Sequence, residues 1–61
     1  MNHAQVLAGI SNCFNVLWEN EYLYDLWMGI LYTEDGDLNY KEWNEDNLYK
    51  MQDDVYTMKT L

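Results

Sequence analysis

The sequence contains no proline and no arginine, and its 61 residues include one histidine and one cysteine. A lone cysteine, Cys13, excludes an internal disulfide, so nothing in the sequence demands an oxidising compartment and we expect a cytoplasmic protein. No apolar run approaches the length of about 20 residues that spans a bilayer, and the amino terminus lacks the pattern of a secretory signal. With no linker-like or repetitive segment either, the chain is expected to form one domain over residues 1–61.

Positive charge is also scarce, because three lysines face eleven acidic residues and leave a formal net charge of −8. Such an excess repels nucleic-acid phosphate and anionic membranes, so we expect no direct binding to either. Hydrophobic residues make up 49% of the chain and aromatic residues 16%, which is too many for a disordered protein. A chain of this size buries only about 60% of its unfolded surface, so a partner or a second copy in a homodimer would help to stabilise it.

The first segment has the periodicity of an amphipathic helix. Asn2 is a suitable N-cap, and Gln5 three residues later completes a capping box. Met1 and Val6 have the spacing of a hydrophobic staple. These signals predict a helix over residues 2–18. Its expected apolar side consists of Val6, Leu7, Ile10, Cys13, Phe14 and Leu17.

A second helix is predicted over residues 21–32, after a break near Glu19 and Asn20. Without that break, Glu21 and Asp25 would lie within the apolar stripe of the first helix. The alternative is a helical hairpin in which one long helix continues through residue 32, since several apolar residues match heptad spacing with one interruption. In the broken form, the inner face of the second helix consists of Leu23, Leu26, Trp27 and Ile30.

The third helix is expected after the turn "TEDGD", over residues 39–58. Asn39 with Glu42 forms a candidate capping box, and Leu38 with Trp43 a candidate staple. The predicted fold is therefore all-α, a small three-helix domain. The core face of this helix is predicted to hold Tyr40, Asn44, Leu48, Met51, Val55 and Met58, with Trp43 at its edge.

The opposite face of the third helix forms an acidic stripe that contains tyrosines. Tyrosine is enriched at recognition surfaces, and lysines that would balance the carboxylates are nearly absent. The stripe is a candidate partner-binding surface, and the alternative is a helix face that is only solvated. The candidate residues are Glu42, Glu45, Asp46, Tyr49, Asp53 and Tyr56, joined by Glu34, Asp35 and Asp37 of the preceding turn.

The segment "LYTEDGDLNYKE" resembles an EF-hand calcium loop over twelve residues, with Asp35, Gly36 and Glu42 at its fifth, sixth and twelfth positions. The resemblance fails at the first and third ligand positions, where Leu31 and Thr33 replace the usual aspartates. A degenerate EF-hand-like protein is therefore a remote alternative, and we expect neither a bound metal nor a cofactor.

Catalytic groups are few. His3 lies near the chain end, Cys13 lies on an apolar face, and no glycine-rich phosphate motif is present. A chain of this size is also not expected to form a cleft in which paired carboxylates could act as acid and base. We therefore expect a protein that is not an enzyme.

In size, acidity, lack of arginine and lack of a catalytic set, the chain resembles the small inhibitors that phages and mobile elements make against host nucleases, including DNA-mimic anti-restriction and anti-CRISPR proteins. The resemblance implies a protein of the host cytoplasm that occupies a basic nucleic-acid-binding groove of a host nuclease or defence complex. The alternative is a small helical adaptor or homodimeric regulator, in which at least one of Trp18, Trp27 and Trp43 lies at an interface.

Overall fold

The computed structural model describes residues 2–60 as an all-α domain, which confirms the predicted fold class. Within that range the only β-type pairing is an isolated bridge between Tyr32 and Leu38. The elements in chain order are α1 (His3–Leu17), α2 (Glu21–Leu31), a short 3-10 helix η1 (Tyr40–Glu42) and α3 (Glu45–Thr60).

Helix α1 begins with the predicted capping box. The Asn2 side-chain oxygen accepts a hydrogen bond from the backbone N–H of Gln5 at 2.9 Å, and the Gln5 side chain accepts from the Asn2 N–H at 3.1 Å. Two N–H groups that an α-helix leaves without partners are thereby satisfied. The predicted staple involves Met1, which lies outside the described residues.

The chain breaks between α1 and α2 as predicted, and the alternative of one long helix is wrong. Asn20 leaves the helical conformation and its side-chain oxygen accepts from the Leu23 N–H at 3.1 Å, so it is the N-cap of α2. Its own N–H donates to the Leu17 carbonyl at 2.8 Å, which satisfies a carbonyl at the end of α1. Glu21 consequently begins a new helix as an exposed residue.

The third helix begins later than predicted, at Glu45 rather than at Asn39. Asn39 makes no side-chain cap for η1, and its amide donates instead to the Ile30 carbonyl at 3.3 Å. Asn44 is the residue that caps α3, since its side-chain oxygen accepts from the Asn47 N–H at 2.9 Å. Tyr40 therefore lies outside α3 and is exposed, as is Asn44, so neither belongs to the core face predicted for them.

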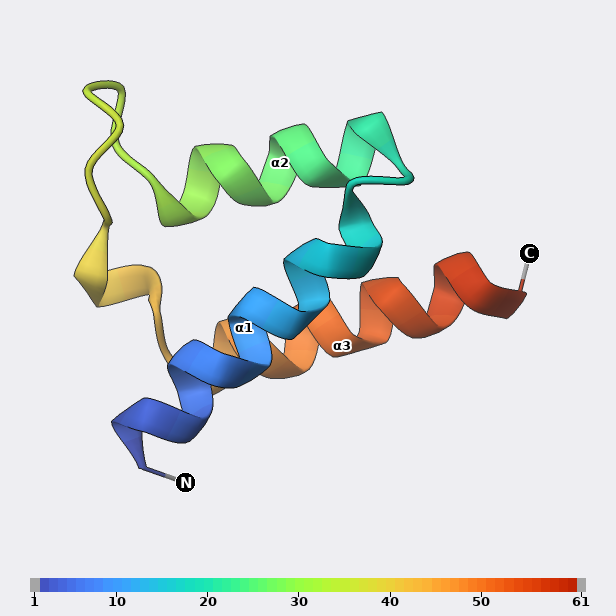
Figure 1. The fold of residues 1–61 in the computed structure, drawn as a ribbon, viewed down its shortest axis with the longest axis horizontal. Helices are drawn as coiled ribbons and strands as arrows, with labels where there is room; N and C mark the ends of the chain where they lie inside the picture. Colours follow the sequence, from blue (N-terminus) through green and yellow to red (C-terminus); the bar gives the residue numbers. More distant parts are fainter. Residues whose placement is uncertain (1, 61) are drawn as a thin grey trace.

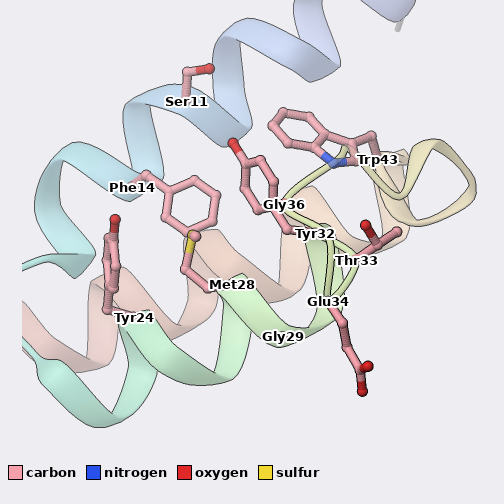
Figure 2. A pocket seen from close by; sticks show the side chains of 10 residues that line it. All are labelled: Ser11, Phe14, Tyr24, Met28, Gly29, Tyr32, Thr33, Glu34, Gly36 and Trp43. Carbon is pink, nitrogen blue, oxygen red and sulfur yellow. The ribbon is translucent and has the colours of Figure 1, made fainter.

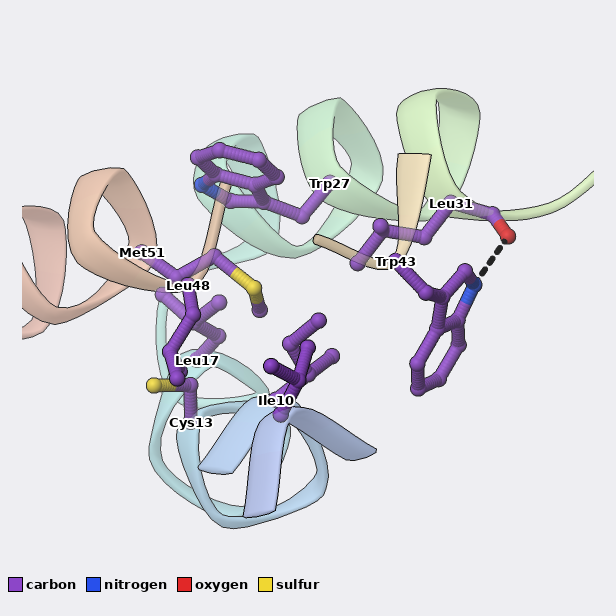
Figure 3. Close-up of a cluster of buried hydrophobic side chains, with 9 residues drawn as sticks. Ile10, Cys13, Leu17, Trp27, Leu31, Trp43, Leu48 and Met51 are labelled. Atoms are coloured by element: carbon purple, nitrogen blue, oxygen red, sulfur yellow. Dashed lines mark hydrogen bonds between the residues drawn. The ribbon is translucent and has the colours of Figure 1, made fainter. Parts of the chain in front are cut away.

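The three α-helices form a flat molecule with extents of 31 × 28 × 16 Å, in which α1 crosses α3 and packs mainly against it, and α2 lies beside α1 (Figure 1). Leu48 and Met51 bring α3 into the core, whereas Val55 and Met58 are only half-buried at its margin. On α2, Trp27 is buried but the predicted inner residue Leu26 is exposed. The core, seen in Figure 3, consists of Val6, Ile10, Cys13, Leu17, Trp27, Leu31, Trp43, Leu48 and Met51.

Two tryptophans connect the elements around this core through hydrogen bonds from their ring nitrogens. The Trp43 ring nitrogen donates to the Leu31 carbonyl at 2.8 Å, which holds the segment before α3 against the end of α2 (Figure 3). The Trp27 ring nitrogen donates to the Asp54 carboxylate at 2.8 Å, which links α2 to α3. Between residues 2 and 60, no helix is both long and apolar enough to cross a membrane.

Candidate functional site

The outer face of α3 carries two aspartates and two tyrosines of the predicted site. Asp46, Tyr49, Asp53 and Tyr56 are all exposed, and their spacing places them opposite the buried residues of the helix. At 1.5 Å of rise per residue, the two aspartates lie about 10 Å apart along the helix axis. Lys50 is also exposed on this helix, so the face is predominantly but not purely acidic.

Glu42 does not belong to this face, contrary to the prediction. It lies in η1 and is half-buried, with one carboxylate oxygen accepting a hydrogen bond from the Asn47 side-chain amide at 3.0 Å. The same amide donates to the Glu42 backbone carbonyl at 2.7 Å. Glu42 therefore positions the start of α3. Glu45 is likewise half-buried, in the first turn of α3, where a carboxylate interacts favourably with the helix N-terminus.

The remaining predicted acidic residues lie in a tight hairpin turn at one corner of the molecule (Figure 1). The Thr33 N–H donates to the Asp37 carbonyl at 2.8 Å, and the Gly36 N–H donates to the Thr33 carbonyl at 2.9 Å. Gly36 has a φ of +90°, a conformation that favours glycine and that closes three-residue hairpin loops. The turn exposes the side chains of Glu34, Asp35 and Asp37.

The geometry of residues 31–42 gives the EF-hand alternative no support. Leu31, at the first ligand position, is fully buried in the core. Its carbonyl already accepts hydrogen bonds from the Trp43 ring and from the Asn39 N–H. In the described part of the chain, no group of three or more histidine, cysteine, aspartate or glutamate side chains is arranged to hold a metal ion.

An open groove lined by aromatic rings is the feature that sequence reasoning missed. It has a volume of about 830 Å³ and lies between α1, α2 and the hairpin turn (Figure 2). The Phe14 ring lies 5.7 Å from that of Tyr24 and 6.3 Å from that of Tyr32, and the Tyr32 ring lies 5.9 Å from that of Trp43. The spacing of Tyr24, Met28 and Tyr32, four residues apart, is the sequence signal that could have located one wall of the groove.

The groove carries little charge of its own. Among the described residues that line it, Glu34 alone has a charged side chain, and Figure 2 shows its carboxylate directed outward, away from the rings. Ser11 and Tyr24 add hydroxyl groups at the border. The groove is therefore an aromatic surface with hydroxyl groups and one carboxylate at its edge.

Cys13 and His3, the two residues considered for catalysis, lie apart from the groove. Cys13 is buried in the core, and desolvation raises the pKa of its thiol above the ordinary value of 9.0, which keeps it in the neutral and unreactive form. His3 is exposed in the first turn of α1. Neither residue lines the groove.

Asp54 is a further acidic residue of α3, outside the predicted site. It is half-buried, and the hydrogen bond from the Trp27 ring gives it a structural role. It therefore does not join the exposed acidic surface.

Comparison with known proteins adds no relative, because no protein-family model, curated protein or solved structure matches this chain.

Proposed function

We propose that this protein is an acidic inhibitor that binds the basic nucleic-acid-binding site of another protein, such as a host nuclease or defence complex, in place of DNA or RNA. It needs neither a catalytic activity nor a cofactor for this role. The observation that carries the proposal is the exposure of most of its carboxylates on a fold with only three lysines. The exposed acidic residues are Glu19, Glu21, Asp25, Glu34, Asp35, Asp37, Asp46 and Asp53.

These carboxylates are spread over three parts of the molecule, which are the α1–α2 corner, the hairpin turn and the outer face of α3. Distributed negative charge attracts a basic groove from a distance. This attraction increases the rate of association more than it strengthens any single contact. Exposed charges farther apart than about 8 Å are largely screened at physiological ionic strength. Binding is therefore expected to weaken steeply as salt concentration rises.

Tyrosines on the outer face of α3 supply contact area between the charges. Tyr49 is 53% exposed and Tyr56 is 68% exposed, and each lies within one helical turn of an exposed aspartate. Tyrosine combines a large apolar ring with a polar tip and is common where proteins bind one another. This face is consequently the best candidate for direct contact with the partner.

The proposal is tested by capture and competition. The immobilised protein is incubated with lysate of a nuclease-bearing bacterium at low and at high salt, and the captured proteins are then tested for binding to duplex DNA and to RNA with and without the free protein. We expect capture at low salt, release by added DNA or RNA, and loss of nucleic-acid binding when the free protein is present. Captured proteins that are unaffected by nucleic acid would contradict the proposal.

Charge variants make the test specific. Asp46→Asn with Asp53→Asn removes the acidic pair of α3, and we expect weaker competition and a shallower dependence on salt. Glu42 is left unchanged because its carboxylate bonds Asn47, so reversing its charge would disturb the start of α3. The matched control, Lys50→Gln, changes the charge of the same helix in the opposite sense and should not weaken binding.

A helical adaptor or homodimer is the second candidate function, and one observation favours it. Trp18, after the end of α1, is 67% exposed, and Tyr22 and Leu26 on α2 are 76% and 43% exposed, so large apolar side chains face solvent on this part of the molecule. An adaptor binding there would keep its partner in the Asp46→Asn, Asp53→Asn variant and lose it on Trp18→Ala. The inhibitor proposal predicts the reverse pattern.

A further inference from the structure

The aromatic groove raises the question of which ligand chemistry it fits. Its volume of about 830 Å³ falls within the range of ligand-binding pockets, about 300–1,000 Å³. Four rings contribute to it, and the edge-to-face contacts of Phe14 with Tyr24 and of Tyr32 with Trp43 set neighbouring rings nearly perpendicular to one another. A group entering such a groove is bordered by aromatic rings in more than one orientation.

Charge limits the choice of ligand. An aromatic face attracts cations through its quadrupole, and no cationic residue lines the groove among those described. Glu34 at the edge and the net charge of −8 add to the same preference. The ring quadrupoles and the negative charge of the protein both disfavour an anionic ligand. Neither effect attracts a neutral ligand.

We infer that the groove between α1, α2 and the hairpin turn binds the guanidinium group of an arginine side chain presented by the basic partner protein. Guanidinium is planar, is weakly hydrated and stacks on aromatic rings, which favours arginine over lysine in such a groove. The lining residues offer hydroxyl oxygens, on Ser11, Thr33 and the tyrosines, as acceptors for its N–H groups. The inference rests on the proposed function for the identity of the partner, but the groove can be tested without that partner.

The test uses N-acetylarginine amide as the probe and N-acetylcitrulline amide as its uncharged isostere. The protein is labelled with carbon-13 at its methionine methyl groups and titrated by NMR. Met28 lines the groove, whereas Met51 lies in the core and Met58 on the last turns of α3. We expect arginine to shift the Met28 signal saturably, and citrulline to bind about threefold to fivefold more weakly.

Two results of this titration would overturn the inference. Equal affinity for arginine and citrulline would show that charge has no part in recognition. Comparable shifts at Met28, Met51 and Met58, or no saturable shift at Met28, would show that the groove is not the site.

Tyrosine variants on one helix provide a matched pair. Tyr24 lines the groove, while Tyr22 is exposed elsewhere on α2. We expect Tyr24→Leu to weaken arginine binding about threefold to fivefold, and Tyr22→Leu to leave it unchanged. Equal effects of the two substitutions would overturn the inference.

A second variant keeps the test decisive if Tyr24→Leu reduces the helical dichroism. Gly29 lines the groove, and an added Cβ there would meet no atom within 4 Å, so Gly29→Leu places a side chain at the groove edge without removing a contact. Arginine binding should fall in Gly29→Leu and persist in Tyr22→Leu, which places a leucine on the same helix outside the groove. Unchanged binding in Gly29→Leu would refute the groove as the site.

The two proposals can fail separately. If the α3 aspartate variants release the partner but Tyr24→Leu binds both partner and arginine normally, the inhibitor proposal stands and the groove inference is wrong. If arginine binds the groove but no captured protein is displaced by nucleic acid, the groove is a cation site and the inhibitor proposal is wrong.

Discussion

The two sides of α1 differ in how closely they pack. Toward α3, Gly9 lies so near to Leu48 that an added Cβ would fall 2.8 Å and 2.9 Å from its two methyl carbons. Toward α2, Phe14 meets Tyr24 and Tyr32 through ring contacts with centroids 5.7 Å and 6.3 Å apart, and an open groove remains beside them. The α1–α3 contact is close because Gly9 has no side chain. The α1–α2 contact is formed by aromatic rings and leaves a groove.

The difference follows from side-chain shape. A glycine lets the neighbouring helix insert an aliphatic side chain against the backbone, which fills space at the density of a protein core. Rings that meet edge to face pack well with one another but cannot fill the wedge between two diverging helices. The same helix therefore has a dense side, where it packs against α3, and an open side, where the groove lies.

Leu48→Ala should have the largest effect on stability, because it leaves a cavity where α3 packs against α1. Leu48 is 2% exposed, and truncation of such a residue costs about 2–5 kcal/mol, which is comparable with the whole stability of a domain this small. Urea denaturation followed by circular dichroism measures the change. Val55→Ala, at a half-buried position of the same helix, should cost less, and a Leu48→Ala variant as stable as the wild type would show that this side is not the core.

Asp54→Ala should have the next largest effect, since it removes the link between α2 and α3. Trp27 is 3% exposed, and its ring nitrogen would lose its acceptor; a buried donor left without a partner costs about 1–3 kcal/mol. The measurement is again the free energy of unfolding. Asp53→Ala, at the neighbouring exposed position, is the control and should change it little, so equal losses would argue against the hydrogen bond.

Gly9→Ala tests how tight the dense side is. Overpacking against Leu48 costs about 1–3 kcal/mol, and the better helix propensity of alanine returns about 1 kcal/mol, so the net loss should be about 0–2 kcal/mol. In a Leu48→Ala background the clash disappears, and the same substitution should become stabilising. A double-mutant cycle with no coupling would show that the two residues are not in contact.

Gly29→Ala is the matching substitution on the open side and should have the smallest effect, with the opposite sign. Its added Cβ meets no atom within 4 Å, so the gain in helix propensity of about 0.5–1 kcal/mol should appear as increased stability. Thermal unfolding measures it. A loss of stability here would mean that the groove is closed in solution.

Local signals in the sequence were sufficient for the caps of α1 and α2, although the cap of α3 by Asn44 was missed. Asn2 with Gln5 caps α1 as predicted, and the break before Glu21 is explained by Asn20, whose oxygen bonds an N–H three residues on. The predicted exposure of Asp46 and Asp53 followed from helical periodicity alone. These features need only the nearest residues along the chain, which is why the sequence predicts them.

The misplaced start of the third helix and the missed groove have a different origin. Asn39 matched the pattern of an N-cap, but its side-chain amide donates to the Ile30 carbonyl. The Trp43 ring nitrogen donates to the Leu31 carbonyl, so both ends of the segment 39–43 are hydrogen-bonded to the end of α2. Those partners are close in space through the hairpin turn. No local pattern distinguishes an asparagine that caps its own helix from one that bonds the end of the previous helix.

The sequence by itself determined the all-α class, the first two helices, the excess of negative charge and the exposure of Asp46 and Asp53 on α3, because periodicity, caps and composition are properties of neighbouring residues. The tertiary structure decided that Glu42 orders the start of α3 through Asn47, that Asp54 receives the Trp27 hydrogen bond, and that four rings from separate segments border one groove. The Trp27–Asp54 hydrogen bond and the groove depend on how the helices cross, to which the close contact of Gly9 with Leu48 and the rings between α1 and α2 contribute. The hydrogen bonds between Glu42 and Asn47 depend instead on where α3 begins.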